Sequence, residues 1–269
     1  MNPGRSSAGT GGRSSAGTGA WQSFTDEIAR CADAGRPVEF WWRDDDAARA
    51  DAALSRLVSL AQRMSIPLAL AAIPAQSEPR AFQDMGPQVS VLQHGTDHAN
   101  RANAGEKKTE FAAAEPVAAA LARLDAARRQ LEKIAAGRFV PVLAPPWNRV
   151  PDRLAAQLAG AGLRGLSQYG PRLRAEFAPG LRQVNTHIDV IAWRTGRAFV
   201  GEDQALGAAT RHLEAKRMQT ADADEATGWL THHAVHDEAA WTFLERLFES
   251  TRALPAVAWR RPEEIFNVL

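Results

Sequence analysis

The chain has 269 residues, of which 45% are hydrophobic and 23% charged, so it can bury a large core within one barrel-sized domain. Its formal net charge of +1 at pH 7 provides no general attraction to nucleic acid. A single cysteine, Cys31, excludes an intramolecular disulfide framework and is expected to be a buried packing thiol. No uninterrupted apolar run approaches the length that spans a bilayer, so neither nucleic acid nor a membrane is an expected partner.

The N-terminal segment differs in composition from the rest of the chain. Residues 4–11 read Gly-Arg-Ser-Ser-Ala-Gly-Thr-Gly, and residues 12–19 repeat them. Because this composition offers little apolar surface to offset the entropy of ordering, residues 1–20 are expected to be a disordered tail. Residues 21–269 are then expected to form one domain. The tail contains no apolar stretch resembling a signal-peptide core, which predicts a cytoplasmic location.

From Trp21 onward, helical and extended patterns alternate along the chain. Helices are expected at 21–34, 47–64, 112–136, 151–161, 203–218 and 238–251. Strands are expected at 38–42, 67–73, 89–93, 139–143, 163–167, 183–191, 227–231 and 256–259. The repeated βα alternation favours an α/β fold in which a parallel barrel is surrounded by helices. An open, doubly wound sheet remains the alternative.

Most of the histidines follow the expected strands closely. Six of the seven fall in three short segments, at 93–98, 186–189 and 231–237, and three consecutive aspartates, residues 44–46, lie upstream of them. Imidazole and carboxylate groups at strand ends can supply metal ligands, a general base and a general acid. The pattern therefore indicates a metal-dependent hydrolase. The remaining histidine, His212, is expected on the surface of a helix.

These segments, in this order, resemble those of the polysaccharide deacetylase family, also called the NodB-homology or carbohydrate esterase 4 family. The resemblance spans roughly Val38 to the C-terminus and implies a distorted parallel (β/α) barrel of about seven strands. In the family an Asp-Asp pair closes the first strand, which assigns Asp44 as the general base and Asp45 as a metal ligand. The family's His-x-x-x-His segment matches His94 and His98 as the other two ligands. One divalent ion is implied, with zinc favoured.

Two of the family's segments depart from its pattern here. Where the family has Arg-x-Pro-Tyr or Arg-x-Pro-Trp, this chain has Ala144 in place of the arginine that orients the base. Either Arg43 or Arg149 is expected to supply that charge from nearby. In the family's Asp-x-x-Asp-Trp segment, Ala192 replaces the second aspartate. Asp189 or His187 would then have to orient the acid.

The last family segment is an apolar strand that ends in histidine, and it makes His232 the general acid. Around the oxyanion and the substrate, the resemblance implies four further residues: Trp147 through its backbone N–H, Asn148, Trp193 and His233.

The activity that the resemblance implies is hydrolysis of a non-peptide C–N bond. An N-acetyl group would be removed from a small-molecule or glycan substrate, and acetate would be released. Two alternatives stay open. The substrate could be another small amide or a ureide. The missing arginine and Ala192 could instead indicate a carbohydrate-binding protein without catalysis.

Overall fold

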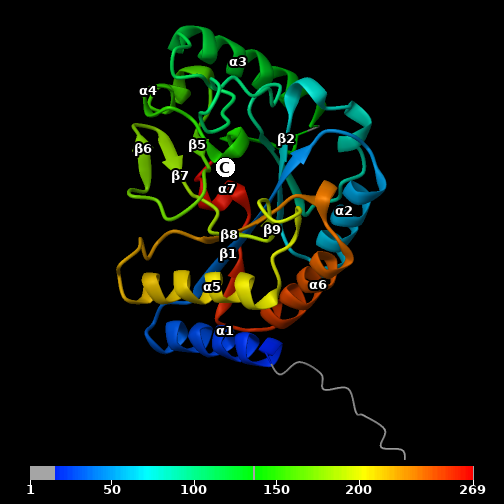
Figure 1. Cartoon of the computed structure of the whole chain (residues 1–269), viewed down its shortest axis with the longest axis vertical. Helices are drawn as coiled ribbons and strands as arrows, with labels where there is room; N and C mark the ends of the chain where they lie inside the picture. The colour runs from blue at the N-terminus through cyan, green and yellow to red at the C-terminus, as the bar shows by residue number, and fades with distance from the viewer. Residues whose placement is uncertain (1–15, 136, 269) are drawn as a thin grey trace, which may run out of the picture.

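A curled, largely parallel sheet lies at the centre of the protein (Figure 1). The structure is a computed structural model that describes residues 16–135 and 137–268. Short apolar runs form the sheet, and every residue of β2 and β3 is buried, as expected for parallel strands covered on both faces. The strands are β1 (Val38–Ala47), β2 (Leu68–Ala72), β3 (Val89–Gln93), β4 (Phe139–Leu143), β5 (Gly165–Leu166), β6 (Glu176–Ala178), β7 (Leu181–Gln183), β8 (Ile188–Asp189), β9 (Ile191–Ala192), β10 (Ala198–Phe199), β11 (Thr227–Thr231) and β12 (Val257–Trp259).

The order of the strands in the main sheet is β6-β7-β5-β4-β3-β2-β1-β11-β8, and β12 also pairs with β1. These neighbours run parallel except for the antiparallel pair β6 and β7. An isolated parallel bridge between Tyr169 and Thr186 links the segment after β5 to the segment before β8. The curl is therefore nearly completed into a barrel. The separate pair β9 and β10 is an antiparallel hairpin.

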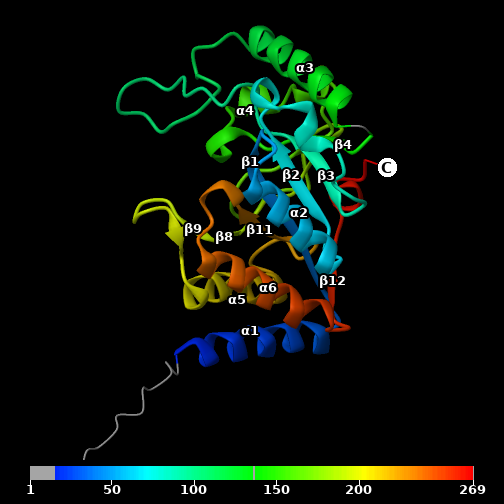
Figure 2. The ribbon, with the colours of Figure 1, turned by 90° about the vertical axis from the view of Figure 1, so that its right-hand side faces the viewer.

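Helices cover the outside of the sheet (Figures 1 and 2). They are α1 (Ala16–Asp33), α2 (Ala52–Met64), α3 (Val117–Ile134), α4 (Asp152–Ala155), α5 (Glu202–Arg217), α6 (Glu238–Arg252) and α7 (Pro262–Ile265). Short 3₁₀ turns connect them: η1 (Pro74–Gln76), η2 (Pro79–Phe82), η3 (Pro146–Asn148), η4 (Leu158–Ala161) and η5 (His233–Val235). Helix α1 packs on α5 and α2 packs on α6, while α3 lies beside β3, β4 and α4.

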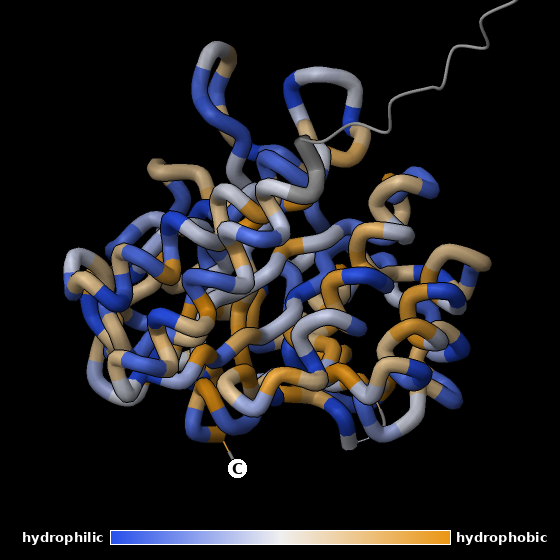
Figure 3. Tube along the Cα trace, turned by 90° about the horizontal axis from the view of Figure 1, so that it is seen from below, coloured by the Kyte–Doolittle hydropathy of each residue, from blue (hydrophilic) through white to orange (hydrophobic). Residues whose placement is uncertain are grey.

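Apolar side chains fill both the space under the helices and the inside of the curl, and Figure 3 shows the hydrophobic segments concentrated in the central strands. Inside, Trp41 meets Phe266 edge-on with ring centroids 5.8 Å apart. Small residues leave room for these rings. A Cβ at Gly228 would come within 2.5 Å of Trp41 Nε1, so this position needs glycine.

The predicted α/β barrel with parallel strands is confirmed, although several element boundaries differ. Helix α1 begins at Ala16, so residues 16–20 are helical rather than part of a disordered tail; residues 1–15 lie outside the described residues. The first strand continues to Ala47, and the helix predicted from residue 47 begins only after Asp51, whose side chain accepts a hydrogen bond from the Leu54 N–H at 2.8 Å.

Two other predicted elements are divided. The strand expected at 183–191 is split between the end of β7, β8 and the start of β9, and the helix expected at 151–161 is split into α4 and η4. Within the described residues, every helix is too short or too polar to cross a membrane.

Candidate metal centre and its surroundings

The three consecutive aspartates of β1 point in different directions because side chains alternate along a strand. Trp42 packs on Phe248 of α6, so even-numbered residues face the helices, whereas Trp41 faces the inside of the barrel. Asp44 therefore faces the helices, like Trp42, and Asp45 faces the inside of the barrel, like Trp41. The pairing of β1 with β2 shifts register after Asp44, which marks a bulge at the strand's carboxyl end.

Asp46 lies in this bulge and has the left-handed backbone angle φ of 71°, which is rare for a non-glycine residue. Its Oδ1 lies 3.2 Å from Nε2 of His94 and 3.2 Å from Nε2 of His98. The two histidines come directly after β3, and His98 also has a positive φ, of 59°. Strained backbone of this kind is concentrated at functional sites. Asp46, His94 and His98 form the candidate metal centre, since their ligand atoms lie within 4.8 Å of one another.

Two imidazoles and a carboxylate are suitable ligands for zinc and other divalent transition metals. Among the described residues, Oδ1 of Asp46 is buried without a hydrogen bond, although two imidazole nitrogens face it. Nδ1 of His94 likewise accepts no hydrogen bond from the described part of the chain, so Nε2 can be the unprotonated nitrogen. The site therefore fits a cation. The carboxylate in it is Asp46, whereas the sequence had predicted Asp45.

The charges in this centre shift the pKa values of its members. Burial raises the pKa of Asp46, but His94 and His98 outweigh burial and hold it below its ordinary value. Burial lowers the pKa of His94, but Asp45 and Asp46 more than compensate and raise it. Protons therefore compete with a cation for His94.

The loop that carries both histidines is held by a buried carboxylate. Glu110 is inaccessible to solvent, and its Oε1 accepts hydrogen bonds from the Thr96 N–H at 2.8 Å and from the Thr96 hydroxyl. Gly95 has φ 62°, and a Cβ there would lie 2.0 Å from Glu110 Oε2. Only glycine allows this close approach. The long loop between β3 and α3 thus returns at Glu110 to fix the metal-binding segment.

Asp45 faces the inside of the barrel and is paired with Arg43. Nε of Arg43 lies 2.9 Å from Oδ1 of Asp45, and Nη2 donates to Oδ2 at 3.0 Å. Both side chains are at most 2% exposed. One hydrogen bond and one close charged contact therefore join the two groups, so the guanidinium compensates the charge of the carboxylate and restrains its orientation. Arg43 thus places a cation directly against Asp45.

Arg43 is itself held in place by neighbours from other elements. Its Nη1 donates to the Ser167 hydroxyl at 2.7 Å, and its Nη2 donates to Oδ1 of Asn148 at 2.6 Å. Asn148 was predicted near the substrate, but its side-chain oxygen supports Arg43. Arg149, the other predicted source of charge, is exposed and donates to the Lys108 carbonyl at 2.8 Å, away from Asp45.

His232 follows β11, and its Nε2 lies 3.9 Å from Oδ2 of Asp45. The ring of Trp193 meets the His232 ring edge-on, with centroids 4.6 Å apart. Trp193 is oriented by Asp189, whose Oδ2 accepts from its indole N–H at 2.8 Å. Burial raises the pKa of Asp189 although His232 opposes the shift. Asp189 therefore orients Trp193, which in turn packs against His232.

The sequence predicted Asp44 as the general base, but its carboxylate faces the helices. It is completely buried on the helix side of β1, and its Oδ1 accepts from Nδ1 of His233 at 2.5 Å. Burial raises the pKa of Asp44, but His233 outweighs burial and lowers it. His233 was predicted near the substrate, but its side chain is only 3% exposed and is paired with Asp44. The position facing the metal centre from the barrel interior belongs to Asp45.

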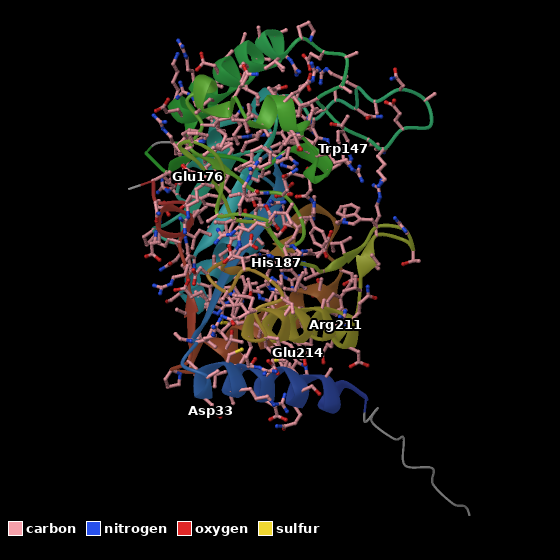
Figure 4. All side chains as sticks on the ribbon, turned by 90° about the vertical axis from the view of Figure 1, so that its left-hand side faces the viewer. Asp33, Trp147, Glu176, His187, Arg211 and Glu214 are labelled. Carbon is pink, nitrogen blue, oxygen red and sulfur yellow. The ribbon has the colours of Figure 1, made fainter. Side chains whose placement is uncertain are left out.

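Trp147 lies in η3 directly after β4 and closes one side of the metal centre. Its ring centroid is 4.5 Å from that of His98, and its φ of 55° is again left-handed. Figures 2 and 4 show that the β3–α3 loop and the β9–β10 hairpin project on the same side of the molecule as Trp147. The candidate metal centre therefore lies on the side of the molecule from which both loops project.

His187 belongs to a second cluster, with His212 and Glu225, and all three residues are buried. This cluster adjoins the amino ends of β8 and β11, whereas His232 follows the carboxyl end of β11, so His187 does not orient the acid as predicted. The two imidazoles stack with centroids 3.7 Å apart. His212 is buried, contrary to the surface position that was predicted, and burial, followed by the charges of His187 and Lys216, lowers its pKa to about 2.

The hydrogen bonds of His187 argue against a cation in this second cluster. Its Nδ1 accepts from the backbone N–H of Gly228 at 3.0 Å, so in the neutral ring Nε2 carries the proton. Nε2 faces Oε2 of Glu225 at 3.2 Å without meeting hydrogen-bond geometry, while the Glu225 carboxylate accepts from the backbone N–H groups of Arg172 at 3.0 Å and Asn185 at 2.8 Å. A metal would have to displace the proton on Nε2 and leave an imidazolate. We therefore assign no metal to this cluster and treat it as a structural group.

Comparison with known proteins shows which solved structures share this fold. No family model matches the sequence, and no curated protein matches it. Solved structures do match. A Mycobacterium smegmatis protein assigned as a polysaccharide deacetylase superposes with a TM-score of 0.59 at 13% identity, over 87% of this chain and 90% of that one. The peptidoglycan deacetylase PdaC from Bacillus subtilis gives 0.52 at 14%, over 88% and 93% of the two chains.

A family 4 carbohydrate esterase from Streptomyces lividans, solved with acetate, gives a TM-score of 0.51 at 11% identity, over 82% and 91% of the chains. These identities are too low to carry over an activity. The protein therefore has the polysaccharide deacetylase fold, of the NodB-homology type, across most of its length, with a His/Asp cluster arranged to hold a divalent cation.

Proposed function

We propose that this protein is a metal-dependent deacetylase that removes the N-acetyl group from a carbohydrate. One observation carries the proposal: the candidate metal centre lies beside a carboxylate, Asp45, that is paired with Arg43, and Nε2 of His232 lies 3.9 Å from the same carboxylate. A ligand set, a base and an acid are then adjacent, as hydrolysis of an amide requires.

The ligands in this proposal are Asp46, His94 and His98. A divalent ion held by them supplies Lewis acidity, which makes water a better nucleophile at neutral pH and polarises an acyl carbonyl. Zinc is the ion we favour, because two imidazoles and one carboxylate are a common set for it.

Asp45 is the general base in this proposal. Its charge is compensated by Arg43, whose two contacts keep both carboxylate oxygens oriented while Asp45 takes a proton from the attacking water. His232 is the general acid that delivers a proton to the departing nitrogen. Its Nε2 lies 3.9 Å from Oδ2 of Asp45, and the residue follows β11, the parallel neighbour of β1, so the base and the acid reach the same place from two strands.

Trp147 and Trp193 define the region for the substrate. Trp193 is 41% exposed, an unusual position for a large aromatic ring, and Trp147 packs against the ligand His98. Rings of this kind can stack on a sugar. The backbone N–H of Trp147 is our candidate for stabilising the oxyanion. The matched structures include enzymes described as acting on peptidoglycan and one solved with acetate, which supports an acetylated glycan or sugar as substrate.

The missing motif arginine does not by itself favour a non-catalytic protein, because Arg43 reaches the base from β1. The test is acetate release by zinc-loaded protein from a panel of acetamido sugars and chitin oligomers, with ureides and simple amides in parallel. We expect release from an acetamido sugar. Release of ammonia from a ureide alone would reassign the substrate, and sugar binding without any acetate would indicate a binding protein.

A matched pair of variants separates metal binding from proton transfer. Asp45→Asn is expected to retain the metal and to lose roughly 10²- to 10⁴-fold in kcat, since general base catalysis has that magnitude. Asp46→Asn is expected to weaken metal binding as well. If Asp45→Asn kept full activity, the assignment of the base would be wrong.

A further inference from the structure

The proposed function assigns no role to the buried carboxylate of Asp44. Asp44 is 0% exposed, and it faces the helix side of β1 rather than the candidate metal centre. A buried carboxylate is costly unless its oxygens are hydrogen-bonded. Its partners all come from one short segment, the residues just after β11.

These partners flank His232 on both sides. The hydroxyl of Thr231 donates to Oδ2 of Asp44 at 2.6 Å, and the backbone N–H of His233 donates to the same oxygen at 3.0 Å. The other oxygen, Oδ1, accepts from Nδ1 of His233 at 2.5 Å. One carboxylate therefore fixes the residue before His232 and the residue after it.

A further contact indicates that the Thr231 hydroxyl is the donor in its hydrogen bond to Asp44. The indole N–H of Trp42 donates to the hydroxyl oxygen of Thr231 at 2.8 Å, so the hydroxyl proton is available for Asp44. Asp44 and Thr231 are also register partners in the parallel pairing of β1 with β11. The turn that carries His232 is thus attached to the same strand that carries Asp45.

His232 depends on this attachment because its own ring has little else to orient it. Among the described residues, its Nδ1 is buried without a hydrogen-bond partner, and its ring packs at a steep angle on that of Trp193. The placement of the backbone therefore sets where the imidazole points. A group that transfers a proton has to lie within hydrogen-bond reach of its target.

We propose that Asp44 is a positioning residue, which holds His232 opposite Asp45 by clamping Thr231 and His233. This inference rests on the proposed function for the role of His232, but the clamp itself is a statement about geometry. The end of β1 would then contribute four consecutive residues, 43–46, to the site. Asp44 would act only through His232.

The first experiment compares Asp44→Asn with the unaltered zinc-loaded protein. The variant is nearly identical in shape but loses the charge that binds His233. We expect kcat on the acetamido sugar to fall roughly tenfold to hundredfold, because a displacement of about 1 Å in a catalytic group costs up to about 10²-fold. KM and the metal content are expected to stay unchanged. A fall in metal content would instead assign Asp44 to the metal centre and overturn the proposal.

The second experiment needs no substrate. In ¹H–¹⁵N spectra of the histidine rings, Asp44→Asn is expected to move and broaden the signals of His232 while those of His94 and His98 persist. If the unaltered protein hydrolyses no acetamido sugar, the proposed function fails, yet these spectra still test the clamp. Unchanged His232 signals together with unchanged kcat overturn the clamp and leave the proposed function standing.

A second pair of variants decides the outcome if Asp44→Asn does not fold. Thr231→Val removes the hydroxyl from the clamp with little change in volume, and Thr231→Ser retains it. We expect Thr231→Val to lower kcat and to move the His232 signals, and Thr231→Ser to recover most of both. Equal effects of the two substitutions would show that the hydroxyl is not part of a clamp and would overturn the proposal.

Discussion

Two clusters in this protein each combine two histidines with one carboxylate, yet they differ in what they can bind. In the candidate metal centre, the two Nε2 atoms face Oδ1 of Asp46, and Nδ1 of His94 accepts no hydrogen bond from the described residues. In the second cluster, the Gly228 N–H occupies Nδ1 of His187 and places the proton on Nε2. The comparison teaches that one backbone N–H can decide whether a histidine is a ligand or a donor.

The largest expected effect separates the two clusters by metal content. His98→Ala removes one ligand and is expected to reduce bound zinc from about one equivalent to well below it, with loss of any acetate release. His212→Phe is expected to leave the zinc content unchanged, because we assign no metal to the second cluster. Elemental analysis after dialysis measures both. Loss of one zinc equivalent in His212→Phe would contradict the distinction between the clusters.

The next effect concerns the buried ion pair beside the metal centre. Arg43→Met leaves Asp45 as an uncompensated buried charge, and breaking such a pair costs about 3–5 kcal/mol. Urea unfolding at pH 7 measures the loss. The matched control is Arg149→Met, which removes an exposed guanidinium and is expected to change stability by no more than about 0.5 kcal/mol. Similar losses in both variants would argue against a special role for Arg43.

A smaller effect is the pH dependence that the second cluster confers on stability. The pKa of His212 is lowered to about 2, whereas an unfolded histidine titrates near its ordinary value of roughly 6.5. Between these values the unfolded state binds one more proton at this residue, so the free energy of unfolding falls as pH falls, by about 1.4 kcal/mol per pH unit. His212→Phe is expected to make this slope shallower by that amount.

Urea unfolding of both proteins at pH 8 and at pH 5 provides the measurement. The difference at pH 8 reports the packing change from the substitution, and only the additional change at pH 5 reports the proton. An identical pH slope in the two proteins would mean that His212 titrates normally in the folded state.

The smallest effect is expected from the hydroxyl that contacts His212. Nδ1 of His212 lies 3.1 Å from Oγ1 of Thr227, and both residues are buried. Thr227→Val should cost about 1 kcal/mol, the typical contribution of one hydrogen bond, while Thr227→Ser should keep most of it. Metal content should not change in either variant, which distinguishes this cluster once more from the candidate metal centre.

The sequence predicts the fold well because the information is local. Strands such as β3 and β11 are continuous apolar runs, and their ends are marked by histidines, so both the element and the approximate place of the site could be read directly. Element boundaries are less well determined. The extension of β1 to Ala47 depends on pairing with β2, which no local pattern reports.

The assignment of the three aspartates failed for a reason that the sequence partly contained. Alternation from Trp41 places Arg43 and Asp45 on one face and Asp44 on the other, which would have separated Asp45 from the buried Asp44. The bulge that turns Asp46 toward His94 and His98 could not be predicted, since it requires a positive φ in a non-glycine residue. The second cluster was also missed, because Glu225 and His212 are brought to His187 only by tertiary packing.

The end of β1 has a consequence for anyone who edits or aligns this protein. Three chemically identical neighbours occupy three unlike environments, one on the helix side, one inside the barrel and one at the candidate cation site. Deleting any one of them would shift the register of the strand, and the survivors could not substitute for it although the count of acids would still look adequate. The presence of several aspartates at the end of a strand therefore does not show which one performs a given role. The path of the backbone has to be compared before these residues are matched between proteins.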